Sequence, residues 1–310
     1  MVVRQALLAA SRSSTIKNLA TAAPPTRAVV ARFVAGEHTE DAVRAASDLA
    51  GMGLHCTIDY LGEDVTSVDE ANATMQAYRR LLAALAEADL TDRAEVSLKL
   101  SAMGQALPSD SAQISLENAR LICQAAQTVG TTVTLDMEDH QTTDLTLETL
   151  RELRKDFPTT GGVLQAALKR TEQDCRDLSY AGSRIRLCKG AYSEPPSVAY
   201  QSPQDVDLSY VRCLKILMAG QGYPMIATHD PRLIDIAGAV AVRTGRARAT
   251  YEFQMLFGVR SEEQRRLAAM GEKVRVYVPF GDQWYPYLIR RMAEKPANLG
   301  LALRAMTSRS

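Results

Sequence analysis

Short stretches rich in β-branched and apolar residues recur along the chain, separated by longer segments with helical spacing. The stretches read HCTIDYL (55–61), EVSLKLS (95–101), TVTLDME (132–138), GVLQAAL (162–168), RIRLCKG (184–190), PMIATHD (224–230), TYEFQML (250–256) and VRVYVPF (274–280). Segments such as ANATMQAYRRLLAALAEA (71–88) and SAQISLENARLICQAAQTVG (111–130) place helix formers at 3.6-residue spacing. This alternation predicts right-handed βαβ units, and eight repeats favour an α/β fold of the (β/α)8 TIM-barrel type over a doubly wound sheet.

The first 50 residues precede these units. HTEDAVRAASDLAGMG (38–53) predicts a helix with its N-cap at Thr39 or Asp41 and its end at Gly51 or Gly53. No Gly/Ser-rich linker or low-complexity tract interrupts the remainder. We therefore expect flanking helices over residues 1–50 and one catalytic barrel domain over residues 51–310.

The composition of the chain limits the kind of ligand that we expect. The 310 residues are 46% hydrophobic, enough for a sizeable core, and 36 basic residues balance 36 acidic ones. A chain without net charge has no field to attract nucleic acid, so we expect a small-molecule ligand and no nucleic acid. Five widely spaced cysteines without a CxxC pair argue against a disulfide framework or a structural zinc site and fit a reducing cytoplasm.

The segment before the first acidic residue, Glu37, is basic. Its charged residues are Arg4, Arg12, Lys17, Arg27 and Arg32. This pattern is typical of a transit peptide, of a segment that rests on anionic lipid, or of an ordinary helix, and the three stay open. No window approaches the roughly 20 apolar residues that a membrane span requires. We expect a cytoplasmic protein and leave peripheral contact with the inner membrane open.

Barrel enzymes place their chemistry at the carboxyl ends of the strands, where the βα loops converge. The polar candidates there are Lys99, Asp136, Glu138, Asp139, Gln165, Lys189, Tyr192, Thr228, His229, Glu252, Gln254 and Tyr277. Some of them could be helix caps, and Asp139 is the clearest case of a residue that is either a cap or a loop acid.

Three chemistries can be compared with this set. Only His140 and His229 lie near strand ends, so a metal hydrolase is weakly supported and we expect no metal. A Schiff-base lyase needs a lysine inside the barrel, and Lys99 and Lys189 both qualify by position. A dinucleotide fold needs GxGxxG after the first strand, whereas GMGLHC precedes it and lacks the third glycine.

The last predicted helix carries adjacent arginines. In YPYLIRRMAEK (285–295), Tyr287, Arg290, Arg291 and Glu294 share one helical face. Such a face is often only the solvated side of a helix. Beside the last strand, however, two guanidiniums could bind a carboxylate through paired hydrogen bonds, with Glu294 orienting one of them.

The motifs RFVAGE, LKLS, LDMED, LQAALKRT, RIRLCKGAY, ATHD, YEFQMLFG and VRVYVPFGDQWYPYLIRR follow one another in this order. Over roughly residues 30–300 the sequence thereby resembles the proline dehydrogenases, specifically the monofunctional bacterial kind. The resemblance implies a (β/α)8 barrel that uses FAD to oxidise L-proline to Δ1-pyrroline-5-carboxylate by hydride transfer to flavin N5. It also implies electron transfer to membrane quinone and a separate pyrroline-5-carboxylate dehydrogenase, which completes the conversion to glutamate.

The resemblance assigns roles residue by residue. Asp136, Arg186 and Tyr277 would be catalytic, with Asp136 holding the Lys99 region and Arg186 directed at flavin N5. The residues implied for the substrate are Lys99, Tyr192, Leu256, Tyr287, Arg290, Arg291 and Glu294. Those implied for the cofactor, besides Arg186, are Met137, Gln165, Lys189, Gly190, Ala191, Thr228 and His229.

Two further expectations come with this assignment. Family members that prefer 4-hydroxyproline tend to carry a smaller residue at the position of Tyr277, so the tyrosine favours proline over the hydroxylated alternative. The loop YSEPPSVAYQSPQDVD (192–207) is rich in proline and turn formers, so it is either a mobile lid or a static surface loop.

Overall fold

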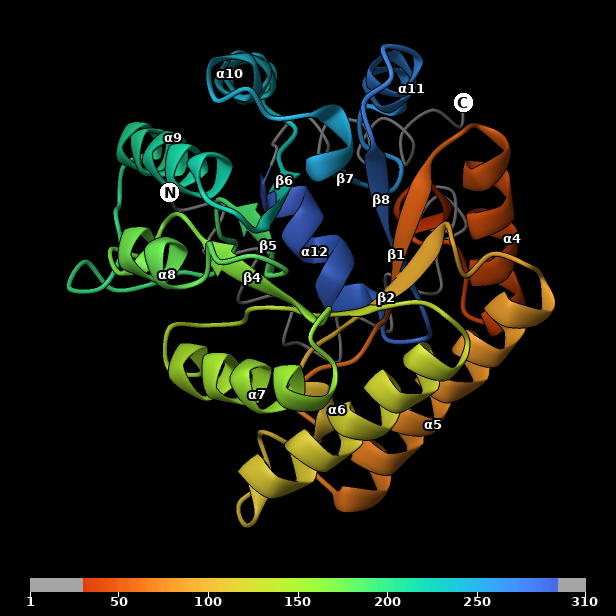
Figure 1. The fold of residues 1–310 in the computed structure, drawn as a ribbon. Helices are drawn as coiled ribbons and strands as arrows, with labels where there is room; N and C mark the ends of the chain where they lie inside the picture. The colour runs from red at the N-terminus through yellow and green to blue at the C-terminus, as the bar shows by residue number, and fades with distance from the viewer. Residues whose placement is uncertain (1–29, 295–310) are drawn as a thin grey trace, which may run out of the picture.

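A closed barrel of parallel strands forms the centre of the molecule, as the alternating pattern predicted (Figure 1). The computed structural model describes residues 30–294, except for the side chains of residues 290 and 292–294. The strands are β1 (His55–Tyr60), β2 (Ala94–Leu98), β3 (Val133–Leu135), β4 (Gly161–Gln165), β5 (Arg184–Cys188), β6 (Tyr223–Ala227), β7 (Glu252–Leu256) and β8 (Val274–Phe280). They pair in chain order, and β8 closes the barrel on β1 through pairs such as Thr57 with Tyr277.

Helices surround the strands. They are α4 (Thr39–Gly51), α5 (Val68–Glu87), α6 (Ser111–Thr128), α7 (Thr143–Asp156), α8 (Thr171–Asp177), α9 (Pro203–Ala219), α10 (Pro231–Arg243), α11 (Ser261–Ala269) and α12 (Trp284–Glu294). Short 3-10 turns occupy Ser101–Met103 and Arg248–Thr250. None of the helices described here is long and apolar enough to cross a membrane.

Local sequence fixes several helix starts. The Ser67 side chain accepts a hydrogen bond from the Glu70 backbone N–H at the start of α5. Ser202 and Asp230 do the same for α9 and α10, where Pro203 and Pro231 occupy the first helical position. The caps at Ser202 and Asp230 determine where the loops after β5 and β6 end.

The start of α4 differs from the prediction. Its N-cap is His38, and neither Thr39 nor Asp41 caps the helix. Asp41 lies inside the first turn, where its Oδ2 accepts the His38 backbone N–H at 3.1 Å. The predicted end is confirmed, since α4 stops at Gly51 and Gly53 adopts a left-handed φ of +74°.

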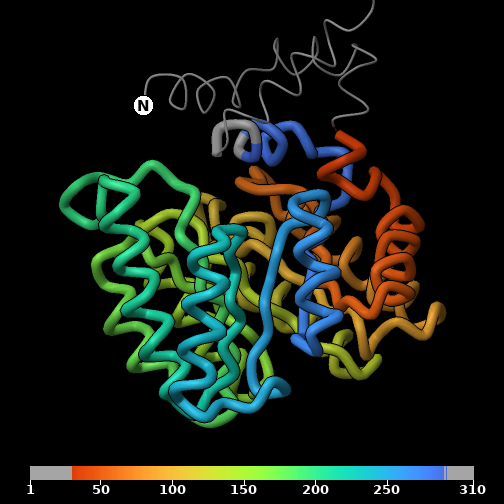
Figure 2. The backbone as a smooth tube through the Cα atoms, turned by 90° about the horizontal axis from the view of Figure 1, so that it is seen from above, coloured from red at the N-terminus to blue at the C-terminus, as the bar shows by residue number. Residues whose placement is uncertain are grey.

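The hydrophobic core lies between the strands and the surrounding helices, and α4 contributes Ala42, Ala46 and Leu49 to it. A second apolar cluster joins Phe33 and Val34 to Trp284, Leu288 and other residues of α12. Figure 2 shows the beginning of the described chain beside α12 at one end of the barrel. The proposed division at residue 50 stays a prediction, and the basic positions before residue 30 lie outside the described residues.

The inside of the barrel is charged. Alternate residues of a strand point to the same face, so Glu95 and Ser97 of β2 both point inward, as do Arg184 and Arg186 of β5. Glu95 and Arg186 are at most 5% exposed. Barrels of this type are commonly filled by branched apolar side chains. Here paired acids and bases, such as Glu95 with Arg184, fill part of that space.

Candidate active site

The carboxyl ends of the strands lie beneath α12. β8 ends at Phe280 and α12 begins at Trp284, so the helix turns back across this end of the barrel (Figure 2). A small pocket between α12 and the strands is lined by Leu61, Gly62, Glu63, Lys99, Gln283, Pro286 and Tyr287. A larger hollow, lined by residues such as Gly182, Gly220 and Arg246, lies near the amino ends of β5 and β6, away from the predicted site residues.

Lys99 forms a buried ion pair that the sequence analysis did not identify. It follows β2 directly, and its Nζ lies 2.7 Å from Oδ2 of Asp59, near the end of β1. Burial alone would lower the pKa of Lys99, but the carboxylates of Asp59 and Asp136 outweigh burial and raise this pKa to about 12. A Schiff-base lysine needs a lowered pKa, so Lys99 fits a permanent cation and not a nucleophile.

Asp136, Arg186 and Tyr277 form one hydrogen-bonded unit. Arg186 Nη1 donates to Asp136 Oδ1 at 2.6 Å, and the Tyr277 hydroxyl donates to Asp136 Oδ2 at 2.7 Å. The Arg186 guanidinium also lies 5.4 Å from the centre of the Tyr277 ring. Burial, followed by the Asp136 charge, raises the pKa of Tyr277 well above its usual value, so the hydroxyl stays protonated as a donor.

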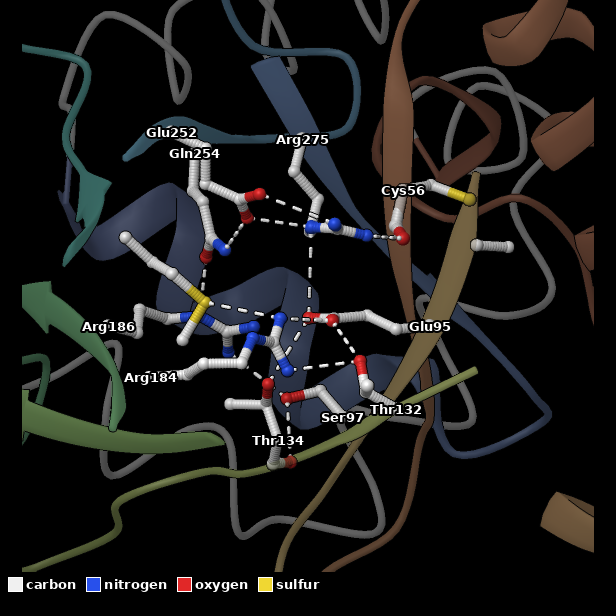
Figure 3. Close-up of polar contacts among 12 residues, drawn as sticks. Cys56, Glu95, Ser97, Thr132, Thr134, Arg184, Arg186, Glu252, Gln254 and Arg275 are labelled. Atoms are coloured by element: carbon white, nitrogen blue, oxygen red, sulfur yellow. Dashed lines mark hydrogen bonds and ion pairs between the residues drawn. The ribbon is translucent and has the colours of Figure 1, made fainter. Parts of the chain in front are cut away.

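Arg186 is held from two sides, as Figure 3 shows. In that view its Nε donates to Gln254 Oε1 at 2.5 Å and its Nη1 donates to Ser97 Oγ at 3.1 Å. Nη1 also donates to Asp136, as described above. The third nitrogen, Nη2, is buried and has no hydrogen-bond partner among the described residues. A buried donor without an acceptor costs about 1–3 kcal/mol, so this nitrogen indicates a partner that is not part of the described chain.

The arginine helix is only partly described. The Arg291 guanidinium lies 5.2 Å from the centre of the Tyr287 ring, in agreement with their predicted shared face. Tyr287 is buried and lines the same pocket as Lys99. The side chains of Arg290 and Glu294 lie outside the described residues, so their roles stay predictions.

The predicted cofactor residues lie where β3 to β6 end. Met137 and Gln165 are buried, and Gln165 Nε2 donates to the Glu138 carbonyl at 2.7 Å. Gly190 has a φ of +106°, which favours glycine, and a Cβ there would lie 3.2 Å from Gln165 Oε1, a tight contact. Ala191 follows Gly190 in the loop after β5.

Lys189 and the next strand carry the remaining predicted cofactor residues. Lys189 Nζ pairs with Asp207 at 2.5 Å and Asp230 at 3.3 Å, so two carboxylates hold its side chain. Thr228 is buried, and its Oγ1 accepts the Asp230 backbone N–H. His229 Nε2 accepts the Leu256 backbone N–H at 2.8 Å, which places the proton of a neutral ring on Nδ1.

The loop after β5 is tied down on two sides. Both carboxylate oxygens of Glu194 contact His140, one at the backbone N–H and one at ring Nδ1. Tyr200 N–H donates to the Ala167 carbonyl at 2.8 Å, farther along the loop. Tyr192, the predicted substrate residue, precedes Glu194 by two positions. These contacts favour the static alternative for this loop.

Three strand-end interpretations can now be compared with the structure. Asp139 is a loop acid and not the N-cap of α7, which is Thr142: its Oδ1 accepts the backbone N–H groups of Gln141 and Thr142 in the turn before the helix. The predicted position of Glu252 at the carboxyl end of its strand is wrong, because Glu252 begins β7 and thus lies at the amino end. Asp136 binds Arg186 and Tyr277 directly, whereas the direct partner of Lys99 is Asp59.

The residues that the sequence analysis missed are Asp59, Ser97 and the contact role of Gln254. Asp59 interrupts the otherwise apolar end of a predicted strand, a signal of the same kind that singled out Asp136. Ser97 is a small polar residue within a strand and gives no such signal. No cluster of three or more His, Cys, Asp or Glu side chains arranged for a metal occurs among residues 30–294.

The fold and site define a (β/α)8 barrel enzyme with a buried, charged centre at the carboxyl ends of its strands. The sequence model for proline dehydrogenase matches residues 42–302. Proline dehydrogenase 1 of Bacillus subtilis (strain 168) is 36% identical over 305 residues, covering 98% of this chain and 99% of that protein. Proline dehydrogenase of Deinococcus radiodurans is 39% identical over 277 residues, covering 89% of each. The chain belongs to the proline dehydrogenase family and is an enzyme of proline oxidation.

Larger proteins contain a similar region. The bifunctional protein PutA of Escherichia coli (strain K12) is 25% identical over 313 residues, which cover 88% of this chain but 24% of PutA. Among solved structures, proline utilization A from Bdellovibrio bacteriovorus, inactivated by N-propargylglycine, matches with a TM-score of 0.81 at 24% identity. That match covers 91% of this chain and 34% of the other, and it establishes the barrel fold.

Proposed function

We propose that this enzyme uses FAD to oxidise L-proline to Δ1-pyrroline-5-carboxylate. The observation that carries the proposal is the Arg186 guanidinium, which Asp136 and Gln254 fix at the centre of a proline dehydrogenase barrel with one buried nitrogen lacking a partner within the described chain. A cation in that position suits a ligand that accepts a hydrogen bond and gains negative charge.

The residues present fit a flavin. Polar and backbone groups converge at the ends of β3 to β6, and Gly190 lets the chain pass close to Gln165. The proposed cofactor residues are Met137, Gln165, Arg186, Lys189, Gly190, Ala191, Thr228 and His229. FAD, when bound, would supply the acceptor for the hydride at its N5 position.

The substrate would be bound through its carboxylate. Lys99 stays protonated because Asp59 and Asp136 raise its pKa, so it presents a lasting positive charge beneath the pocket. We propose that Arg290 and Arg291 complete a cationic site for the carboxylate, with Glu294 orienting one of them. Neighbouring cations also disfavour a protonated substrate amine, and oxidation at the adjacent carbon requires the unprotonated amine.

The ring of the substrate would be held by apolar and aromatic walls. The proposed wall residues are Tyr192, Leu256, Tyr277 and Tyr287. Asp136 would act by fixing both Arg186 and Tyr277, because it accepts hydrogen bonds from both. In the family resemblance a smaller residue at position 277 makes room for a 4-hydroxyl group, so with Tyr277 we propose proline and not 4-hydroxyproline as the preferred substrate.

Further steps are proposed from the family resemblance. Electrons would pass to membrane quinone, and a separate pyrroline-5-carboxylate dehydrogenase would continue the conversion to glutamate. The enzyme would be cytoplasmic, with peripheral contact at the inner membrane through the basic segment before Glu37. Residues 1–50 would flank a single catalytic domain over residues 51–310.

An absorption spectrum tests the central proposal. The purified enzyme should be yellow, and anaerobic L-proline should bleach its visible flavin bands, with a water-soluble quinone restoring them. Arg186→Met should slow bleaching, whereas Arg79→Lys, an exposed change on α5, should leave it unchanged. A colourless protein with no flavin released on denaturation, or a flavin that L-proline does not reduce, would contradict the proposal.

A further inference from the structure

Gln254 joins the site to charges deeper in the barrel (Figure 3). Its Oε1 accepts a hydrogen bond from Arg186 Nε at 2.5 Å, and its Nε2 donates to Glu252 Oε1 at 2.6 Å. Glu252 Oε1 also accepts from Arg275 Nε at 2.7 Å. Hydrogen bonds therefore run without interruption from Arg275 through Glu252 and Gln254 to Arg186.

The donors and acceptors in this series permit one orientation of the Gln254 amide. Arg186 offers only donors, and an ionised Glu252 offers only acceptors. A flipped amide would place Nε2 against Arg186 and Oε1 against Glu252, and both hydrogen bonds would be lost. Gln254 is 3% exposed, so water cannot replace them.

Glu252 keeps its charge because of its neighbours. Burial would raise its pKa, but Arg275 and Lys273 outweigh burial and hold this pKa below the usual range. Glu252 Oε2 is close to Arg275 Nη2 and Lys273 Nζ, at 3.3 and 3.4 Å. The carboxylate is thus a fixed acceptor, and it fixes the direction of the amide beside it.

The far side of Arg186 is equally constrained. Its Nη1 lies between Asp136 Oδ1 and Ser97 Oγ, so the planar guanidinium is held at Nε from β7 and at Nη1 from β2 and from the residue that follows β3. A planar group fixed at two nitrogens has no remaining freedom of rotation, so the direction of the third nitrogen is set. That nitrogen, Nη2, is the buried donor without a partner among the described residues.

We propose that Gln254, oriented by Glu252, is a positioning residue that holds Arg186 with Nη2 directed at the bound flavin. The inference rests on the proposed function, which assigns Arg186 to the flavin. A fixed cation stabilises the negative charge of the reduced flavin more than a mobile one, because no reorganisation is needed when the charge appears. Loosening Arg186 should therefore make the flavin harder to reduce.

Gln254→Met tests this role, because methionine matches glutamine in length and volume but offers Arg186 no comparable acceptor. The matched control is Gln264→Met, a change to another buried glutamine, which donates to the Leu256 and Val259 carbonyls from α11. The readouts are flavin content and the midpoint potential of the bound flavin, measured by anaerobic titration with reference dyes.

Gln254→Met should retain flavin and lose about tenfold in its preference for the reduced form, which for a two-electron couple is about 30 mV more negative. Gln264→Met should keep the wild-type potential. If Gln254→Met does not fold, Gln254→Asn carries the same comparison, since the shorter amide withdraws its oxygen from Arg186. An unchanged potential in a folded, flavin-loaded Gln254 variant would overturn the inference. A wild-type enzyme without flavin would instead overturn the proposed function.

Discussion

Lys99 Nζ lies 2.7 Å from Asp59 Oδ2, and both side chains are buried within the barrel. The pair joins the end of β1 to the end of β2, and the Lys99 side of it faces the pocket under α12. The cation is thereby present before any anionic ligand arrives. A lysine that is protonated and paired in this way can bind a carboxylate. It does not suit a reaction in which the lysine must first lose its proton.

Asp59→Asn should destabilise the enzyme because it leaves a buried ammonium without its carboxylate. Removal of one partner from a buried ion pair costs about 3–5 kcal/mol. The double variant Asp59→Asn/Lys99→Met should recover part of that loss. Urea denaturation at pH 7 measures the free energies of unfolding.

The control for this prediction is Asp92→Asn. Asp92 pairs with Arg93 at the surface, where its side chain is 73% exposed. Loss of such a pair changes stability by less than about 1 kcal/mol. Equal effects of Asp59→Asn and Asp92→Asn would mean that the Lys99 pair contributes no more than a surface contact.

Tyr277→Ser should raise the ratio of kcat/KM for 4-hydroxyproline to kcat/KM for proline by about tenfold, equivalent to about 1.4 kcal/mol. The change removes the ring that, under the proposed function, would fill the space of the hydroxyl group. Tyr277→Phe is the matched control, since it keeps the ring and removes only the hydrogen bond to Asp136. Steady-state kinetics should show lower activity for Tyr277→Phe with an unchanged ratio. A ratio that moves equally in both variants would assign specificity to the hydrogen bond instead of the ring.

Arg291→Lys should raise KM for proline about tenfold, because lysine retains the charge but loses the planar fork that binds a carboxylate. Flavin content, measured by absorbance after denaturation, should stay at the wild-type level. The sequence predicts the same result for Arg290→Lys. Arg79→Lys, on the exposed face of α5, provides the control. A wild-type KM for proline in both α12 variants would show that these arginines do not bind the substrate.

Much of the fold follows from local pattern. The stretches rich in β-branched residues and the 3.6-residue helices between them predicted the barrel, since right-handed βαβ units leave few alternatives. Polar residues at strand ends pointed to Asp136 and Lys99 because a charged group there needs a partner or a ligand. Tyr287 and Arg291 contact each other as helical spacing predicted.

The local sequence pattern does not predict which side chains contact each other. The contact of Asp59 with Lys99 depends on the register that places Asp59 opposite Ser97. Arg186 and Gln254 lie on β5 and β7, and they meet only because the barrel is closed and both side chains point inward. The wrong placement of Glu252 did not come from the strand boundary, because Glu252 is third in the predicted stretch 250–256 and first in β7, so it lies toward the amino end in both.

Glu138→Gln should change the pH dependence of stability. Glu138 is buried beside β3, and Ser101 donates to it through its hydroxyl at 2.6 Å and its backbone N–H at 3.1 Å. Burial raises the pKa of Glu138 to about 7, although these hydrogen bonds favour the ionised form. In the unfolded chain the ordinary value of 4.5 applies.

The sign of the effect follows from proton binding. Between about pH 4.5 and pH 7 the folded enzyme keeps a proton on Glu138 that the unfolded chain has released. The contribution of this proton to the free energy of unfolding is therefore fully present below about pH 4.5 and is lost as the pH rises through 7. The loss amounts to up to about 3 kcal/mol, at 1.36 kcal/mol per pKa unit. Glutamine imitates the protonated carboxyl, so Glu138→Gln should become more stable than wild type as the pH rises from 5 to 8. Urea unfolding at each pH measures the difference, with Glu148→Gln, an exposed change on α7, as the control that should show no such trend. Parallel pH curves for wild type and Glu138→Gln would show that this carboxyl is ionised in the folded enzyme.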